Sequence, residues 1–249
     1  MDIQTLRQQA IREVREKLRN SVSDDLLIVQ AVSNIEDLEK VVNLTSKRLR
    51  EWYELYNPEI SNAVDNHEKF VSLILSKTKK ELLKEINVDD TMGAEFTKEN
   101  LDAVMNLAKQ IKELFQLKHQ QEEYLETMME KTCPNVKEVA GTLIGAKLIS
   151  LAGSLIKLSK FPASTVQLLG AEKALFRHLK NRRNLPPKFG ILHEHAFIGK
   201  VAPRNKGKMA RTLADKISIA SKVDYFKGKF VGKELFKQVE KKATELSKR

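Results

Sequence analysis

A long stretch without Gly or Pro constrains the fold of this chain more than any other feature. Neither residue occurs between Thr5 and Tyr56, so nothing there interrupts an α-helix. Apolar residues recur in this stretch every seven positions, which is the pattern of a coiled-coil seam. One seam position is taken by Ile28, Ile35, Val42 and Leu49, and the other by Ala31, Leu38, Thr45 and Trp52. The sequence therefore predicts one long helix that packs in a coiled coil.

Two further helices are expected before the composition changes. Pro58 ends the first helix, a second is predicted over 59–85, and 87–96 is read as a loop. Thr97 is a good N-cap for a third helix. The residues predicted to form the coiled coil are Leu38, Val42, Leu49, Val104, Leu107, Ile111 and Leu114. We expect a long antiparallel hairpin, because these helices exceed the average globular length, and a globular bundle is the alternative.

Charge divides the chain into two halves of different composition. Residues 1–132 contain 19 Lys and Arg against 25 Asp and Glu, a net charge of −6, whereas residues 133–249 contain 25 against 8, a net charge of +17. Glycine follows the same division, because Gly93 alone lies in the first half. We therefore predict a helical coiled-coil domain over 1–132 and a basic helical domain over 133–249.

The basic half is predicted to be helical and compact, so the whole chain is assigned to the all-α class. Gly, Ala and Ser recur at three- and four-residue spacings over 139–158, which lets helices approach closely. Gly141 to Gly145 lacks the Gly-Lys-Ser of a phosphate loop, and no predicted strand precedes it, so nucleotide binding is not indicated. The Lys-rich stretch 227–249 is interpreted as a solvated face or a flexible basic tail.

Two clusters of cations in this half point to an anionic partner. The first spans 157–188 and contains a single acid, and the second spans 204–216. A short helix over 171–180 would carry a cationic stripe formed by Lys173, Arg177 and Lys180. Because few acids balance these cations, nucleic acid is favoured over a merely solvated face. A membrane surface is the main rival, and the absence of Trp from this half and the scarcity of large apolar residues beside the clusters argue against it.

No arrangement of residues indicates an enzyme, a metal site or a cofactor. His193-Glu194-His195 lacks the HExxH spacing of a zinc site, and a structural role or a contact to RNA suits these histidines better. Cys133, the single cysteine, has no neighbouring His or Asp to activate it and no second thiol to bridge, which indicates a reducing compartment. No stretch approaches the roughly 20 apolar residues of a membrane span. We expect an intracellular, cytoplasmic protein with no membrane partner.

Several motifs in the basic half together resemble the Nop domain. They are Gly145-Ala-Lys-Leu-Ile149, Ala152-Gly-Ser154, Lys160-Phe-Pro-Ala-Ser-Thr165, Gln167-Leu-Leu-Gly-Ala-Glu-Lys-Ala-Leu-Phe-Arg177 and Gly207-Lys-Met-Ala-Arg211. Upstream, the chain resembles the coiled-coil region that precedes this domain in the archaeal Nop proteins of box C/D ribonucleoproteins, at Arg48-Leu-Arg-Glu-Trp-Tyr53, Asn57-Pro-Glu59 and Cys133-Pro-Asn135. Relatives are the eukaryotic nucleolar Nop proteins and a spliceosomal pre-mRNA-processing factor. The resemblance covers essentially the whole chain.

This resemblance implies an RNA-binding scaffold of archaeal type that is not itself a catalyst. In that family the Nop domain holds a kink-turn of the box C/D guide RNA together with a small ribosomal-type kink-turn-binding protein, and the coiled coil pairs two copies. Fibrillarin, a separate subunit that uses S-adenosylmethionine, performs the ribose 2′-O-methylation. Full-length relatives carry a further N-terminal domain that holds fibrillarin. This sequence starts with the helix that approaches the coiled coil, so we expect the docking domain to be absent here.

The resemblance and the charge pattern together assign site residues. RNA contacts are expected at Lys160, Gln167, Lys173, Arg177, Lys180, His193, His195, Arg204, Lys206, Lys208 and Arg211. Contacts to the protein partner are implied for Gly170, Ala171, Glu172, Leu175 and Phe176. The turn from His193 to His195 departs from the commoner family pattern. Two alternatives remain: a self-sufficient RNA-modifying enzyme, and a purely structural coiled-coil adaptor whose basic domain binds nonspecifically.

Overall fold

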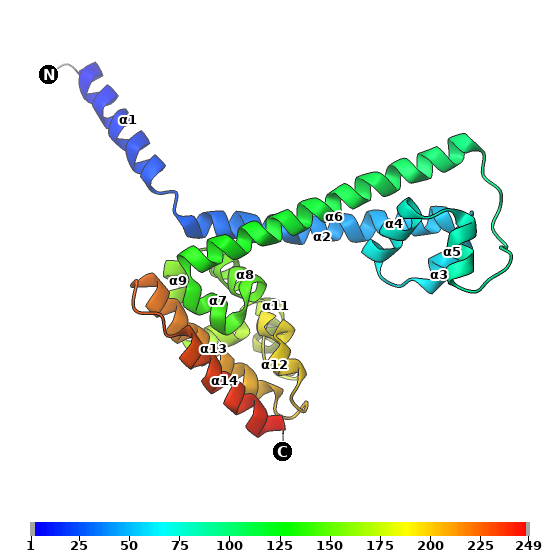
Figure 1. Cartoon of the computed structure of the whole chain (residues 1–249). Helices are drawn as coiled ribbons and strands as arrows, with labels where there is room; N and C mark the ends of the chain where they lie inside the picture. The colour runs from blue at the N-terminus through cyan, green and yellow to red at the C-terminus, as the bar shows by residue number, and fades with distance from the viewer. Residues whose placement is uncertain (1–2, 248–249) are drawn as a thin grey trace. The chain divides into compact units, whose positions relative to one another are not determined.

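A computed structural model describes residues 3–247, and the chain is helical along most of this range (Figure 1). No β-strand occurs among these residues, which confirms the all-α class. The chain separates into two compact units, one formed by 1–33 with 124–249 and the other by 34–123. Two long helices contribute residues to both units, α2 (Asp24–Glu54) and α6 (Lys98–Thr132). The compositional boundary predicted near Cys133 lies at the end of α6 and stays a prediction.

The first long helix is divided, so the prediction of a single helix over 5–56 is wrong. α1 (Ile3–Asn20) ends before Ser23, and α2 begins directly after it. The backbone N–H of Leu26 donates to the Ser23 carbonyl at 3.0 Å, and the Ser23 hydroxyl donates to Asp25. Two acids occupy the first turn of α2, where the helix dipole favours negative charge. A serine followed by acids thus starts a new helix without Gly or Pro.

One of the two predicted seam positions of α2 is buried throughout. Ile28, Ile35, Val42 and Leu49 are each at most 3% exposed. At the other position Leu38 and Thr45 are half-buried and Trp52 is exposed, while Tyr53 is buried in its place. A straight α-helix drifts by about 20° per heptad relative to a seven-residue repeat. Over three heptads this drift carries Trp52 off the inward face.

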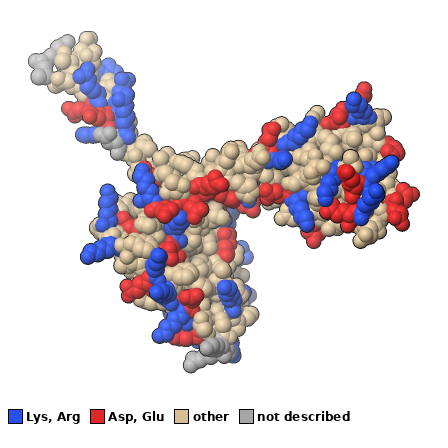
Figure 2. Space-filling model, in the orientation of Figure 1, with Lys and Arg blue, Asp and Glu red and all other residues tan. Residues whose placement is uncertain are grey.

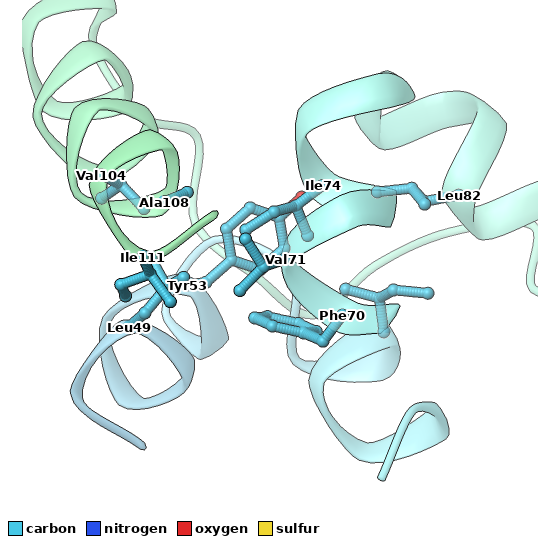
Figure 3. Close-up of a cluster of buried hydrophobic side chains, with 10 residues drawn as sticks. Leu49, Tyr53, Phe70, Val71, Ile74, Leu82, Val104, Ala108 and Ile111 are labelled. Atoms are coloured by element: carbon cyan, nitrogen blue, oxygen red, sulfur yellow. The ribbon is translucent and has the colours of Figure 1, made fainter. Parts of the chain in front are cut away.

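The second coiled-coil helix, α6, packs against α2 within the unit formed by 34–123. Val104 and Ile111 are buried and join Leu49 in one hydrophobic cluster (Figure 3). Leu107 and Leu114 are half-buried. The pattern matches the long antiparallel hairpin expected from the sequence. The seam position of Val104 and Ile111 is more deeply buried than that of Leu107 and Leu114.

The segment predicted as one helix over 59–85 forms three short ones, and that prediction is wrong. They are α3 (Pro58–Ala63), α4 (His67–Ser76) and α5 (Lys79–Glu85). Each starts at a residue suited to an N-cap: Asn57 and Asn66 accept backbone N–H bonds with their side chains, and Thr78 forms a capping box with Glu81. These caps break the apolar run. Phe70 of α4 packs edge-on against Tyr53, with ring centroids 5.6 Å apart (Figure 3).

A loop joins α5 to α6, as predicted. Thr97 accepts the Asn100 backbone N–H with its hydroxyl at 3.3 Å and caps α6. A Cβ on Gly93 would lie 2.1 Å from the Tyr56 carbonyl oxygen, so only glycine fits this close backbone approach.

The unit formed by 1–33 with 124–249, called the compact unit from here on, is built around α13 (Lys206–Tyr225). Its neighbours are α7 (Pro134–Ala140), α9 (Leu155–Lys160), α10 (Ala163–Leu168), the 3₁₀ helix η1 (Ile191–Glu194), α12 (Ala196–Gly199) and α14 (Gly232–Ser247). The unit also contains α8 (Thr142–Ala152) and α11 (Glu172–Lys180). Gly145 faces Met129 and Val136 so closely that an added Cβ would lie 2.8 Å from the Met129 methyl carbon. The small residues of α8 therefore serve core packing, as expected.

The C-terminal stretch is an ordered helix and not a flexible tail. α14 buries Leu235, Val239, Ala243 and Leu246 against α7 and α13. These four residues recur at three- and four-residue spacings, which is the pattern of an amphipathic helix. The high density of Lys on the other face obscured that pattern, and the interpretation of 227–249 as a tail is corrected for residues 232–247.

A buried polar network holds α7 to the turn between α13 and α14. One carboxylate oxygen of Asp224 accepts the backbone N–H of Asn135 at 3.1 Å and its side-chain amide at 2.6 Å, and the other accepts the Val136 N–H at 2.8 Å. The Asn135 side-chain oxygen accepts the Val231 N–H at 2.7 Å. Asn135 and Asp224 are at most 8% exposed. The Asp224 carboxylate thus caps the N-terminus of α7, and Asn135 of the Cys-Pro-Asn motif fixes the chain leading into α14.

Candidate nucleic-acid interface

Helix α11 presents two chemically different faces to solvent and buries none of its residues. Lys173, Arg177 and Lys180 are exposed along one stripe, as predicted from their spacing. Phe176 and Leu179 form an apolar stripe beside it and are 66% and 56% exposed. The half-buried side chains that turn toward the rest of the unit are Ala174, Leu175 and His178. A partner covering the outer side of α11 would meet cations and an aromatic ring together.

The turn that leads into α11 is tied to a distant backbone segment. Gly170 has a φ of +86°, a left-handed conformation that favours glycine, and its N–H donates to Glu172 at 2.7 Å. Ala171 is the N-cap residue of α11. The Gly190 N–H donates to the Gln167 carbonyl at 2.8 Å, and a Cβ there would lie 1.8 Å from the Leu169 carbonyl oxygen. Two of the residues implied as protein contacts, Gly170 and Glu172, thus shape this turn.

A second cluster of predicted residues lines a hollow between α10, α13 and α14. The hollow has a volume of about 650 Å³. Gln167, Lys208 and Arg211 line it, joined by Lys216 and by Lys242 of α14. The Gln167 side-chain amide donates to the Lys188 carbonyl at 2.6 Å. This bond holds the side-chain carbonyl oxygen of Gln167 in place. Asp215, which also lines the hollow, pairs with Lys216 at 3.2 Å, and Lys242 pairs with Glu245 at 2.9 Å. The remaining cations of the lining, Lys208 and Arg211, favour an anionic ligand.

The other predicted cations lie outside this hollow. Lys160 is exposed at the end of α9, and Arg204 is exposed just before α13. Lys206 is the first residue of α13 and is half-buried. On the face drawn in Figure 2, Lys and Arg side chains stand out from the compact unit at several places. The structure therefore spreads the predicted cations over α9, α11 and α13 instead of gathering them in one cleft.

The two histidines of the His193–His195 turn have different surroundings. His193 is exposed, and its Nδ1 lies 3.1 Å from the Gly190 carbonyl oxygen. His195 is 9% exposed and caps α12 by accepting the Phe197 N–H at 3.3 Å. Burial lowers the pKa of His195, so it favours the neutral ring that this cap requires. Its expected contact with RNA is corrected: the side chain is part of the interior.

Three contributors to these surfaces were missed by the sequence reasoning. Leu179 and Leu185 are 56% and 90% exposed on and just after α11, and Lys242 joins the hollow from the helix that was read as a tail. The apolar spacing within 232–247 was the signal that would have revealed α14. No signal distinguishes an exposed leucine from a buried one in a helix as short as α11.

The described residues contain little that would support chemistry. No group of three or more His, Cys, Asp or Glu within 3–247 is arranged to hold a metal ion. Glu194, between the two histidines, lies 3.1 Å from the Lys147 ammonium in an ion pair. Cys133 is buried, which raises the pKa of its thiol and suppresses the reactive thiolate. No described helix is long and apolar enough to cross a membrane.

Comparison with known proteins gives a family and several relatives. The family model Nop, described as a snoRNA binding domain and fibrillarin, matches residues 34–245. A NOP5 family protein of Methanocaldococcus jannaschii is 40% identical over 90% of this chain and 58% of its own length. Nucleolar protein 56 of Schizosaccharomyces pombe is 40% identical over 85% of this chain and 47% of its own. Nucleolar protein 58 of the same yeast is 37% identical over 84% and 44%.

A solved structure is similar to this chain over most of its length. A chain in a crystal structure of a fibrillarin/NOP5P complex matches with a TM-score of 0.57 and 26% identity, over 98% of this chain and 78% of that chain. The sequence matched here spans about half the length of the curated relatives.

Proposed function

The chain belongs to the Nop family, and from this premise we propose that it is an RNA-binding scaffold of a box C/D ribonucleoprotein. It recognises a kink-turn of the guide RNA jointly with a small kink-turn-binding protein. It is not the catalyst, and ribose 2′-O-methylation is carried out by a fibrillarin subunit. The names of its relatives support this proposal, since they include nucleolar proteins 56 and 58 and a NOP5 chain solved with fibrillarin.

The two-faced surface of α11 is the observation that carries the proposal. The exposed cations Lys173 and Arg177 suit phosphates, whereas Phe176 beside them suits a protein surface or an unpaired base. Leu179, the other member of the apolar stripe, has no ring on which a base could stack, so RNA alone does not account for the whole stripe. A surface that needs both an RNA and a protein to cover it is the arrangement expected for composite recognition.

Self-association through the coiled coil is the second part of the proposal. α2 carries an exposed apolar stripe that its intrachain seam does not use. Its members are Val41, Leu44 and Trp52, which share one side of the helix, and Leu55 follows directly after the helix end; the four are 39–68% exposed. Exposed apolar surface of this extent on a regular helix favours a helical partner. A second copy of the chain is the partner that we propose.

The test is a gel-shift titration with a kink-turn RNA, with and without the kink-turn-binding protein, at several salt concentrations. We expect tight binding only when that protein is present. Replacing Lys173 and Arg177 by Gln should weaken the complex and reduce the slope of log affinity against log salt by about 2, since each lost phosphate contact removes roughly 0.9.

Exchange of a pair of cations in the other unit, 34–123, is the matched control. Lys109 and Lys112 are exposed on α6, and their replacement by Gln should leave the slope unchanged. An unchanged slope in the Lys173/Arg177 variant would refute the assigned contact. Equal binding to any RNA, independent of the partner protein, would refute composite recognition and favour a nonspecific basic adaptor.

A further inference from the structure

The turn between α13 and α14 gathers most of the exposed aromatic rings of the compact unit. Phe226, Phe230 and Tyr225 are 76%, 49% and 37% exposed. Within 133–247 the only other aromatic ring of comparable exposure is Phe176 on α11. Three exposed rings lie within six residues, in a chain with 6% aromatics. Exposing such a patch to water is unfavourable, which indicates an interaction site.

Lysines alternate with these rings along the chain. The turn and its flanks carry Lys222, Lys227, Lys229 and Lys233, all exposed. None of these four ammonium groups has a carboxylate partner within the described part of the chain. The one acid between them, Asp224, is buried in the network with Asn135. Rings and cations are therefore interspersed in the turn, where the rings suit bases and the cations suit phosphates of a nucleic-acid strand.

Hydrogen bonds fix the backbone of the turn that carries the rings. Lys227 adopts the left-handed conformation, with a φ of +52°. The Gly228 N–H donates to the Val223 carbonyl at 2.8 Å, and the Lys227 N–H to the Asp224 carbonyl at 3.2 Å. This is the bonding of a Schellman end to α13. Asn135 fixes the far side of the turn through the Val231 N–H. Little conformational entropy is left to lose on binding.

A hollow beside the turn determines how a ligand would be oriented there. It has a volume of about 800 Å³, and Tyr225 and Phe230 line it together with Ile156. Its lining also contains the buried carboxylates of Asp25 and Asp224 and the exposed side chains of Lys131 and Lys227. The two carboxylates repel phosphate, whereas the exposed lysines at the turn attract it. A nucleotide would therefore approach with its neutral base toward the rings and its phosphate toward solvent.

We propose that this turn, residues 222–233, is a second RNA site that binds an unpaired strand by stacking and by phosphate contacts. The rings of Tyr225 and Phe226 are 5.0 Å apart and inclined by 71°, so they cannot stack on the same base and instead suit successive splayed bases. The site lies at the opposite end of α13 from Lys208, about 25 Å away along the helix at 1.5 Å per residue. It is thus separate from the hollow that contains Lys208 (Figure 1, orange turn).

The test uses the full chain and a fluorescein-labelled 12-nucleotide oligoadenylate, which cannot form a kink-turn. Binding is followed by fluorescence anisotropy at several salt concentrations. Phe226→Ala with Phe230→Ala should lower the affinity by about 10-fold or more, because each stacked base contributes substantially, while the salt slope stays the same. Lys227→Gln with Lys229→Gln should reduce the slope by about 1.4, at roughly 0.7 per phosphate of a single strand.

The control is Leu143→Ala, which removes from α8 an apolar side chain that is 40% exposed, close to the 49% of Phe230, and this variant should bind as the unchanged chain does. Far-ultraviolet circular dichroism shows whether each variant is folded. Affinity of the ring variant within twofold of the original overturns the proposal. So does ring-dependent binding to phosphatidylserine vesicles combined with ring-independent binding to oligoadenylate. The ring variant should still join the kink-turn complex, which separates this proposal from the one for α11.

Discussion

Replacing Asn135 by Ala is expected to destabilise the compact unit more than any exposed substitution. The change removes the acceptor of the Val231 N–H, a neutral hydrogen bond of 2.7 Å, and a donor to the Asp224 carboxylate at 2.6 Å. A neutral bond contributes about 1 kcal/mol and a bond to a charged group about 1.5–3 kcal/mol. Since the Asp224 carboxylate remains buried and Val231 is half-buried, we expect a loss of about 3–4 kcal/mol.

Thermal unfolding followed by circular dichroism or calorimetry measures this loss. For a domain of this size each kcal/mol lowers the midpoint by about 2–4 °C, so the transition of the compact unit should fall by roughly 6–16 °C. Asn106→Ala on an exposed face of α6 is the control and should change stability by less than about 0.5 kcal/mol. A midpoint for Asn135→Ala within 2 °C of the original would refute the assignment of the network as a stabilising element.

Asn135→Asp adds a pH test of the same contact. Burial raises the pKa of Asp224, and a second carboxylate in contact with it raises the affinity of the folded pair for a proton further. The folded state of this variant then binds more protons than the unfolded state, so its stability falls as the pH rises. We expect its deficit relative to the original chain to shrink on acidification from neutral pH toward pH 5. A deficit that is independent of pH would contradict direct contact between the two carboxylates.

Two further predictions concern the unit formed by 34–123. The pKa of His119 is raised by its hydrogen bond to Glu68 at 3.0 Å, so this contact stabilises the unit fully below about pH 6.5 and is lost as the pH rises through the raised pKa. The midpoint difference between the original chain and His119→Gln should therefore shrink between about pH 5.5 and 8.5, and a constant difference would contradict the contact. Leu44→Asp should shift the sedimentation of the chain from dimer to monomer, because it charges the exposed stripe of α2. Asn43→Asp adds the same charge away from that stripe and should leave the dimer intact, and a dimer in both variants would count against the stripe as the interface.

Periodicity and composition predicted the features that depend on local spacing. The seam position of Ile28 and Leu49 follows from seven-residue spacing, and both residues are buried. The stripe of Lys173 and Arg177 follows from a four-residue spacing. The break before α2 and the three short helices after Pro58 were missed because Ser, Asn and Thr caps are weaker signals than Gly or Pro. These helix boundaries are overlooked when only the period of the apolar residues is considered, because the period continues across them.

The surfaces proposed here depend on exposure, and the sequence alone does not determine exposure. His195 and His193 stand two residues apart in the same basic segment, yet one is buried against the interior and the other is at the surface. Trp52 and Tyr53 show the same contrast across a single residue, since a 100° rotation about the helix axis separates a solvent-facing ring from a core ring. Side-chain type alone would have assigned both members of each pair to the same role.

The network of Asn135 with Asp224 shows why a motif can be recognised before its role is understood. The two residues are 89 positions apart, and neither has a periodic pattern that would connect them. Once they are in contact, the Asn side chain bridges the capping carboxylate of α7 and the backbone that enters α14. That bridge also sets the conformation of the turn that exposes Phe226 and Phe230. A change at Asn135 should therefore weaken binding of an unpaired strand as well as stability, whereas changes to the exposed rings should affect binding alone, because the rings contribute little to the core that the bridge holds together.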